Sequence, residues 1–122
     1  MILTKEPVFQ EFHIEGVQHI TPANALKALH NEEAIMIDVR EEPECSLESI
    51  TSPGVLYYPM SGIVAQLSNI PREKPIIIMC NAGVRSTRVV NFFNHNGFIN
   101  AVNLDGGIIA WKGLGLPTQH GL

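Results

Sequence analysis

The sequence predicts an α/β protein in which a mostly parallel central sheet carries helices on both of its faces. Short apolar runs at 34–37, 76–79 and 101–104 alternate along the chain with segments of helical periodicity. This alternation is typical of strands joined by crossover helices, and continuous apolar runs indicate strands that are buried on both faces. The 122 residues are enough for one domain with a core of its own.

The first half of the chain supplies one helix and two strands. A Thr-Pro pair, which is typical of a cap and a first helical position, predicts a helix over 22–30. A buried strand is expected at 34–37 and a second strand at 55–58. Residues 41–54 contain two prolines and little periodicity, so the sequence predicts an irregular connection between these strands.

The second half of the chain continues the same alternation of apolar runs and helical patterns. Gly97 is a natural residue to end a helix, because glycine tolerates the left-handed conformation found there. We expect a helix over 61–67, a central strand over 76–79, a helix from about Arg85 to Gly97, a strand over 101–104 and a short helix carrying Trp111.

The start of the chain is the segment with the weakest pattern. Phe12 and Ile14 alternate with polar residues, as in an edge strand. We therefore predict that residues 1–17 form an N-terminal extension or edge strand and that residues 18–122 form the domain itself. There is no internal repeat and no low-complexity linker.

Composition and charge argue against two classes of partner. The net charge is −4 and 16% of residues are charged, so the chain has no basic field for nucleic acid or for an anionic membrane. Lys5, Glu6 and Pro7 lie where a signal peptide would need a continuous apolar stretch. We expect a cytoplasmic protein that binds neither nucleic acid nor membrane.

The two cysteines, Cys45 and Cys80, are expected to be free thiols, because a reducing cytosol disfavours their pairing. Cys45 lies in a polar stretch that suggests a loop or a short helix. No metal site is predicted, because the histidines lack metal-ligand spacing. These histidines are His13, His19, His30, His95 and His120.

Cys80 lies where a buried strand ends and a helix begins. A helix start presents unpaired N–H groups, and the small residues Ala82 and Gly83 allow the loop amides to curl toward the sulfur. Arg85 adds a full positive charge, and these features together favour the thiolate. A cation in the first helical turn also opposes the helix dipole, so we expect a compensating anion near the loop.

Three segments resemble the single-domain rhodaneses. Residues 80–86 (CNAGVRS) are similar to the active-site loop of that family, 37–41 (IDVRE) to its D-x-R-E segment, and 104–111 (LDGGIIAW) to its L-x-G-G-x-x-A-W close. The resemblance covers roughly residues 18–117 and keeps the family's order and spacing. It implies a rhodanese-like fold and sulfurtransferase activity.

The resemblance and the position of Cys80 assign roles to particular residues. Cys80 is the expected catalytic nucleophile. Substrate binding is expected from the rest of the loop, which consists of Asn81, Ala82, Gly83, Val84, Arg85 and Ser86. Ser86 either donates a hydrogen bond toward the thiolate or satisfies the helix start. Structural roles near the site are expected for Asp38, Arg40, Gly106, Gly107 and Trp111, the last as core or pocket wall.

The spacing between Cys80 and Arg85 separates two kinds of chemistry. Cysteine phosphatases and many arsenate reductases have five residues between these positions, whereas this chain has four. One residue fewer shortens the loop by up to about 3.5 Å of chain. The smaller ring of amides suits a sulfur atom carried on the cysteine better than the oxygens of a phosphate, which favours sulfur transfer over phosphatase or arsenate reductase activity.

The implied reaction is a double displacement without a metal or organic cofactor. The Cys80 thiolate takes a sulfane sulfur from thiosulfate or a persulfide and passes it to a thiol, to cyanide or to a protein acceptor. The alternative that stays open is a rhodanese-like module that binds partners or senses oxidants, because an exposed thiolate is also what oxidants attack.

Two positions depart from the family pattern. Asn81 stands where rhodaneses often have arginine or lysine, and residues 48–50 (ESI) stand where Gly-His-Ile is common. Thiosulfate is a dianion, so the missing cation at Asn81 favours a persulfide or polysulfide as the donor. Because of the second departure, the family pattern does not predict the shape of the entrance to the site.

Overall fold

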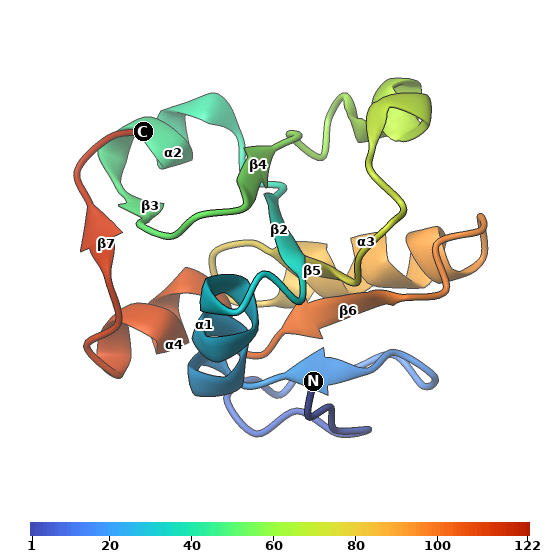
Figure 1. Ribbon diagram of the computed structural model, residues 1–122, viewed down its shortest axis with the longest axis horizontal. Coiled ribbons are helices and arrows are strands. Elements are labelled where there is room, and N and C mark those ends of the chain that lie inside the picture. The colour runs from blue at the N-terminus through green and yellow to red at the C-terminus, as the bar shows by residue number, and fades with distance from the viewer.

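The computed structural model describes residues 1–122. The α/β class with a mainly parallel central sheet is confirmed, and Figure 1 shows its arrangement. Along the chain the elements are β1 (His19–Ile20), α1 (Pro22–His30), β2 (Ile35–Asp38), α2 (Glu42–Leu47), β3 (Ser49–Ile50), β4 (Val55–Tyr57), the 3-10 helix η1 (Ile63–Asn69), β5 (Ile76–Met79), α3 (Val84–Asn94), β6 (Ala101–Leu104), α4 (Gly107–Gly113) and β7 (Thr118–Gln119).

The central sheet has five strands in the order β1-β6-β5-β2-β4, and every neighbouring pair is parallel. In the middle of the sheet Ile37 lies opposite Ile78, and Ile76 lies opposite Ala101. The carboxyl ends of β2, β5 and β6 therefore meet at one edge. Ligands of parallel sheets bind outside this edge, and the segment after β5 begins with Cys80.

Both faces of the sheet are buried, as the continuous apolar runs predict. One core contains Ile76 and Ile78 of β5 together with α3 residues such as Phe93. The other contains Ile77 of the same strand together with residues of α1 and α4, including the fully buried Trp111. Successive side chains of β5 thus alternate between two layers, and α3 lies on the opposite side of the sheet from α1 and α4.

The prediction of an irregular connection over 41–54 is wrong. Residues Glu42–Leu47 form α2, and β3 pairs with β7 in a second, antiparallel sheet. The helix begins at a capping box in which the Glu41 and Glu44 side chains each accept from the other residue's backbone N–H. Pro43 lies in the first turn, where its missing N–H costs no helical hydrogen bond.

Two further boundaries differ from the prediction. The segment 61–67 does not form an α-helix, because η1 is a 3-10 helix over Ile63–Asn69. The helix expected to reach Gly97 ends earlier, at Asn94. Gly97 has the expected left-handed conformation, with φ of 92°, but it lies in the turn after the helix.

The N-terminal segment contains no strand at Phe12 or Ile14. It contacts the domain through one β bridge and through hydrogen bonds to Asp105. Its only β contact is a single antiparallel bridge between Thr4 and His19. The Asp105 carboxylate accepts hydrogen bonds from the N–H groups of Val8 and Phe9, at 2.6 and 2.9 Å. Figure 1 shows this segment running beside β1, so the extension lies next to the carboxyl end of β6.

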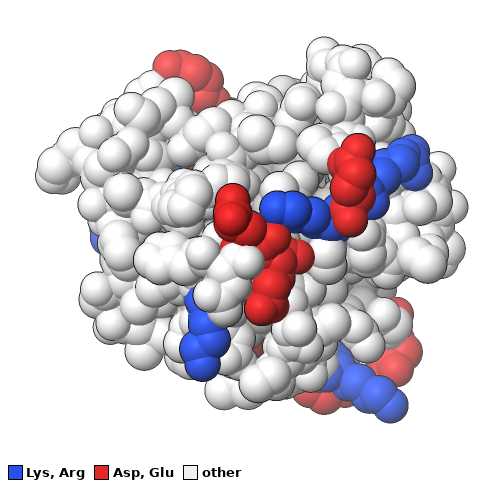
Figure 2. Space-filling view, in the orientation of Figure 1, with Lys and Arg blue, Asp and Glu red and all other residues white.

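Charged side chains are sparse and mixed on the face drawn in Figure 2. Acidic and basic groups adjoin one another there, and neither sign forms an extended patch. None of the helices combines the length and the apolar character that a membrane span requires.

Candidate active site

The Cys80 loop is anchored by hydrogen bonds to the start of α4. The Ile108 and Ile109 N–H groups donate to the carbonyl oxygens of Cys80 and Asn81, at 3.0 and 3.1 Å. This close approach requires Gly107, because a Cβ there would lie 2.4 Å from the Asn81 carbonyl oxygen and its φ is +61°. With its carbonyls bound to α4, the loop turns amides toward the sulfur.

Two N–H donors and one hydroxyl group surround Cys80 Sγ. The N–H groups of Gly83 and Ser86 lie 3.2 and 3.4 Å from the sulfur, and the Ser86 hydroxyl lies 3.2 Å from it. The Ser86 hydroxyl itself donates to Asn103 Oδ1 at 2.6 Å, a partner that neither of the two expected roles of Ser86 includes. The sulfur is enclosed rather than exposed, since Cys80 is only 1% accessible, and in this respect the expectation of an exposed thiolate is wrong.

Arg85 pairs with a carboxylate of the protein itself. Its two terminal nitrogens each donate to an oxygen of Glu44, both at 2.7 Å. The Arg85 guanidinium lowers the pKa of Glu44 to about 2, and the same hydrogen bonds raise the pKa of Arg85. The compensating anion expected near the loop is thus supplied by α2, and it neutralises the charge of the loop arginine.

Asp38 and Arg40 form a buried ion pair below the site. The Arg40 Nη2 atom lies 2.9 Å from Asp38 Oδ2 and also donates to the Glu48 carbonyl at 2.8 Å. Both side chains are at most 4% exposed. The pair connects the end of β2 to the end of α2, so it fixes the helix that carries Glu44.

The second cysteine, Cys45, lies in α2 in a different environment. Its thiol donates to Asp38 Oδ2 and to the Arg40 carbonyl, at 3.6 and 3.8 Å. Burial, together with the Asp38 carboxylate, raises the pKa of Cys45 to about 11. Both cysteines are free, as predicted, and the short helix is one of the two settings expected for Cys45.

A cavity of about 340 Å³ lies beside the loop. Its rim includes Leu47 and Ile109, whose side chains are 76% and 56% exposed. Lys112 on this rim is paired with Glu48. The wall is formed by Arg40, Glu44, Leu47, Glu48, Asn81, Ile108, Ile109 and Lys112. A larger hollow of about 600 Å³ near β4 and the C-terminus includes no residue of the Cys80 loop.

The remaining predicted residues lie around this centre. Asn81, Ala82 and Val84 are exposed on the outside of the loop, and Asn81 borders the cavity. Gly106 adopts φ of 79° before α4. Trp111 is core rather than pocket wall, because it is fully buried and its indole N–H donates to the Pro117 carbonyl at 2.9 Å.

Sequence reasoning missed four polar residues of the site. They are Gln10, His19, Glu44 and Asn103, and the last three of these carry a signal in retrospect. Glu44 completes the E-x-x-E capping pattern that begins at Glu41. His19 and Asn103 are polar residues inside or beside apolar strand runs, where a buried polar group requires a partner.

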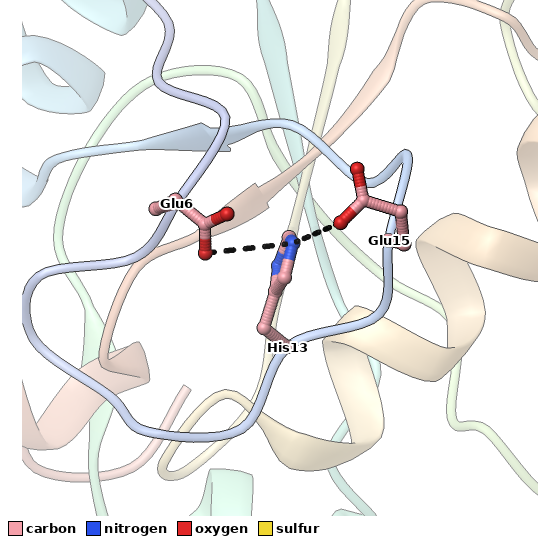
Figure 3. Close-up of side chains that lie close together, drawn as sticks. All are labelled: Glu6, His13 and Glu15. Carbon is pink, nitrogen blue, oxygen red and sulfur yellow. Dashed lines mark ion pairs between the residues drawn. The ribbon is translucent and has the colours of Figure 1, made fainter.

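A group of potential metal ligands lies outside the loop. Figure 3 shows Glu6, His13 and Glu15 pointing toward one another, and the His13 Nε2 atom lies 3.8 and 3.9 Å from the two carboxylates. Both carboxylates are largely exposed, at 74% and 96%. The histidine spacing along the sequence did not indicate this group, because two of its three members are glutamates.

Comparison with known proteins identifies the family. The model of the rhodanese-like domain family matches residues 21–114. A sulfurtransferase of Allochromatium vinosum is 35% identical over 86 residues, which cover 70% of this chain and 78% of that protein. The chain belongs to the rhodanese-like domain family, and this relative places it among the rhodanese-type sulfurtransferases.

The same domain occurs in proteins of known structure and in longer proteins. The crystal structure of a rhodanese-related protein from Thermoplasma volcanium superimposes with a TM-score of 0.75 at 27% identity, covering 84% of this chain and 97% of that one. A tRNA uridine(34) hydroxylase of Sodalis glossinidius is 26% identical over 88% of this chain, but the match spans only 33% of that protein. The domain therefore also occurs as a part of larger proteins.

Proposed function

We propose that the protein transfers a sulfane sulfur through a persulfide on Cys80. The Cys80 thiolate attacks the outer sulfur of a donor, the donor S–S bond breaks, and the donor leaves as a thiolate, or as sulfite when the donor is thiosulfate. A thiol or cyanide then attacks the outer sulfur of the Cys80 persulfide. This second displacement releases a new persulfide or thiocyanate and regenerates the Cys80 thiolate.

The observation that carries this proposal is the pair of backbone N–H groups directed at Cys80 Sγ. Gly83 and Ser86 donate to the sulfur from a loop whose carbonyls are already bound elsewhere. Such fixed donors stabilise negative charge on the sulfur, both in the thiolate and in the anionic persulfide. No metal or organic cofactor takes part in the two displacements.

The charges at the mouth favour a persulfide over thiosulfate as the donor. The cations nearest the site are each paired with a carboxylate, Arg85 with Glu44, Arg40 with Asp38 and Lys112 with Glu48. A dianion therefore meets no uncompensated positive charge there, and Asn81 adds none. An organic persulfide carries less charge than thiosulfate. Its carbon chain can also contact the apolar rim that Leu47 and Ile109 form.

The proposal is tested by sulfur transfer to cyanide, with a persulfide and with thiosulfate as donors. Cys80→Ser should abolish thiocyanate formation, whereas Cys45→Ser should keep most of it, because Cys45 supplies neither the reacting atom nor a contact to it. Equal loss in both variants would overturn the assignment of the nucleophile. A protein that forms thiocyanate from neither donor would instead be a binding or redox-sensing module.

The same preparations test the competing phosphatase chemistry. We expect no hydrolysis of p-nitrophenyl phosphate above the Cys80→Ser control, because the loop has four residues rather than five before Arg85. Phosphate release that depends on Cys80 would contradict the argument from loop size.

A further inference from the structure

We propose that Asn103 is a positioning residue that directs the Ser86 hydroxyl hydrogen away from Cys80 and so restrains ionisation of the thiol. The inference rests on the proposed role of Cys80 as the reacting group. It follows from a chain of hydrogen bonds that leads from the N-terminal segment through Gln10 and Asn103 to Ser86.

The orientation of the Gln10 amide is fixed by backbone groups. Its Oε1 atom accepts from the Gly106 N–H at 2.8 Å, and its Nε2 atom donates to the Phe12 carbonyl at 2.8 Å and lies 3.2 Å from the Gly83 carbonyl. Turning the amide over would place N–H against N–H and oxygen against oxygen at these contacts. Gln10 therefore presents an acceptor, Oε1, to Asn103.

Gln10 in turn fixes the orientation of Asn103. The Asn103 Nδ2 atom lies 3.0 Å from Gln10 Oε1 and 3.1 Å from His19 Nδ1, so its two hydrogens have two acceptors. The other end of the amide, Oδ1, then faces Ser86 Oγ at 2.6 Å. Because Oδ1 has no hydrogen, the Ser86 hydroxyl must donate to it.

His19 supports the same arrangement. It is fully buried, and burial, together with neighbouring His13, lowers the pKa of His19. The neutral ring accepts from Asn103 at Nδ1 and therefore donates from Nε2 to His13 Nδ1, which lies 2.8 Å away. The charged groups facing His19 are Asp105 and Glu6, which favour its protonation but do not outweigh burial and His13.

The consequence for Cys80 is competition for one hydrogen. A thiol at Cys80 can donate to Ser86 Oγ, so the protonated state satisfies every group. A thiolate can accept from the Ser86 hydroxyl only if the hydroxyl turns toward the sulfur, and that turn leaves the buried Asn103 Oδ1 without a donor. Asn103 thus opposes ionisation that the two backbone N–H groups promote.

The test is the pH dependence of Cys80 alkylation by iodoacetamide, measured in a Cys45→Ser background so that one thiol reacts. Asn103→Leu keeps a side chain of similar size but removes the acceptor. We expect the pH midpoint of the alkylation rate to fall by about one unit, because the hydroxyl becomes free to donate to the thiolate. A midpoint that stays the same or rises overturns the proposal.

A double-mutant cycle separates this role from general disturbance of the loop. In a Ser86→Ala background there is no hydroxyl to direct, so Asn103→Leu should leave the midpoint unchanged. The same downward shift in both backgrounds would show that Asn103 acts by another route and would overturn the proposal. If Asn103→Leu does not fold, the half-buried Gln10→Ala decides: it frees the Asn103 amide to turn, and a lower midpoint supports the proposal whereas an unchanged one contradicts it.

Sulfur loading of the same variants distinguishes failure of this inference from failure of the proposed function. If Cys80 accepts no sulfur from a persulfide in the protein with an unaltered site, the proposed function fails. The alkylation midpoints still report whether Asn103 controls the Ser86 hydroxyl, because alkylation needs no sulfur donor.

Discussion

The two cysteines of this protein share burial and the free thiol state but differ in the polarity of their neighbours. Cys80 Sγ accepts N–H hydrogen bonds from Gly83 and Ser86. Cys45 Sγ donates to oxygens of Asp38 and Arg40. Donors around a sulfur stabilise its anion and acceptors stabilise its thiol, so the two buried cysteines lie in opposite hydrogen-bonding environments.

The difference arises from their places relative to a helix start. Cys45 lies inside α2, where its own N–H donates to the Glu41 carbonyl at 3.3 Å. Cys80 precedes α3, and the first amides of a helix have no partner within the helix. Position before a helix start rather than inside a helix, and not burial, thus separates the two sulfurs.

The largest expected effect comes from removing the donors around Cys80. Gly83→Ala places a methyl group 1.8 Å from Gln10 Oε1 at a residue whose φ of +100° is strained for alanine, so the Gln10 amide or the loop has to shift. We expect a loss of about 100-fold in kcat/KM for sulfur transfer, which is typical when one fixed backbone donor is displaced.

The matched control is Gly113→Ala in α4. A Cβ at Gly113 meets no atom within 4 Å, and its φ is not positive. Activity of this variant should stay close to that of the unaltered protein. If Gly83→Ala were as active as Gly113→Ala, the loop donors would not explain the contrast between the cysteines.

A smaller effect is expected from Glu44, which connects α2, the helix of Cys45, to the Cys80 loop. Glu44 lies one position before Cys45 and neutralises Arg85 of the Cys80 loop. Glu44→Gln keeps the oxygen that accepts from the Glu41 N–H but removes the negative charge. We expect the KM for thiosulfate to fall by about three- to tenfold, and the gain to shrink at high salt.

Steady-state kinetics with two donors sharpen this prediction. The KM for an organic persulfide should change less than that for thiosulfate, because the persulfide carries less charge. An unchanged KM for thiosulfate would show that the Glu44–Arg85 pair does not set donor preference.

The smallest effect concerns stability at alkaline pH. Cys45 has a pKa of about 11 in the folded protein against an ordinary value of 9.0, so above pH 9 the unfolded chain loses this proton first. The free energy of unfolding should therefore decrease between pH 9 and 11, and the decrease should be less steep in Cys45→Ala. Urea unfolding at several pH values measures both slopes, and equal slopes would mean that Cys45 does not resist ionisation.

The order of the main strands along the chain and the place of Cys80 after β5 were predictable because they depend on local sequence. The apolar run at 76–79 gives β5 directly, and the small residues after Cys80 allow the loop to turn its amides inward. The α2 helix was missed because two prolines outweighed its capping residues Glu41 and Glu44 in the interpretation of 41–54.

The partners of the loop were not predictable because they come from distant parts of the chain. Arg85 and Glu44 are 41 positions apart, and Asn103 and Gln10 are 93 positions apart. No local pattern relates such pairs, and only the parallel sheet brings them to the same edge. The residues proposed to carry the chemistry were thus recognisable from the sequence, whereas those proposed to adjust it required the fold.

Mass spectrometry of the purified protein before and after treatment with an organic persulfide tests the central claim most directly. Because a transferred sulfur atom stays bound to the accepting cysteine, we predict a gain of about 32 Da on the peptide that contains Cys80. The peptide containing Cys45 should stay unmodified, and a thiol or cyanide should remove the added mass. A gain on Cys45, or a Cys80 that gains no sulfur from the persulfide or from thiosulfate, would contradict the account.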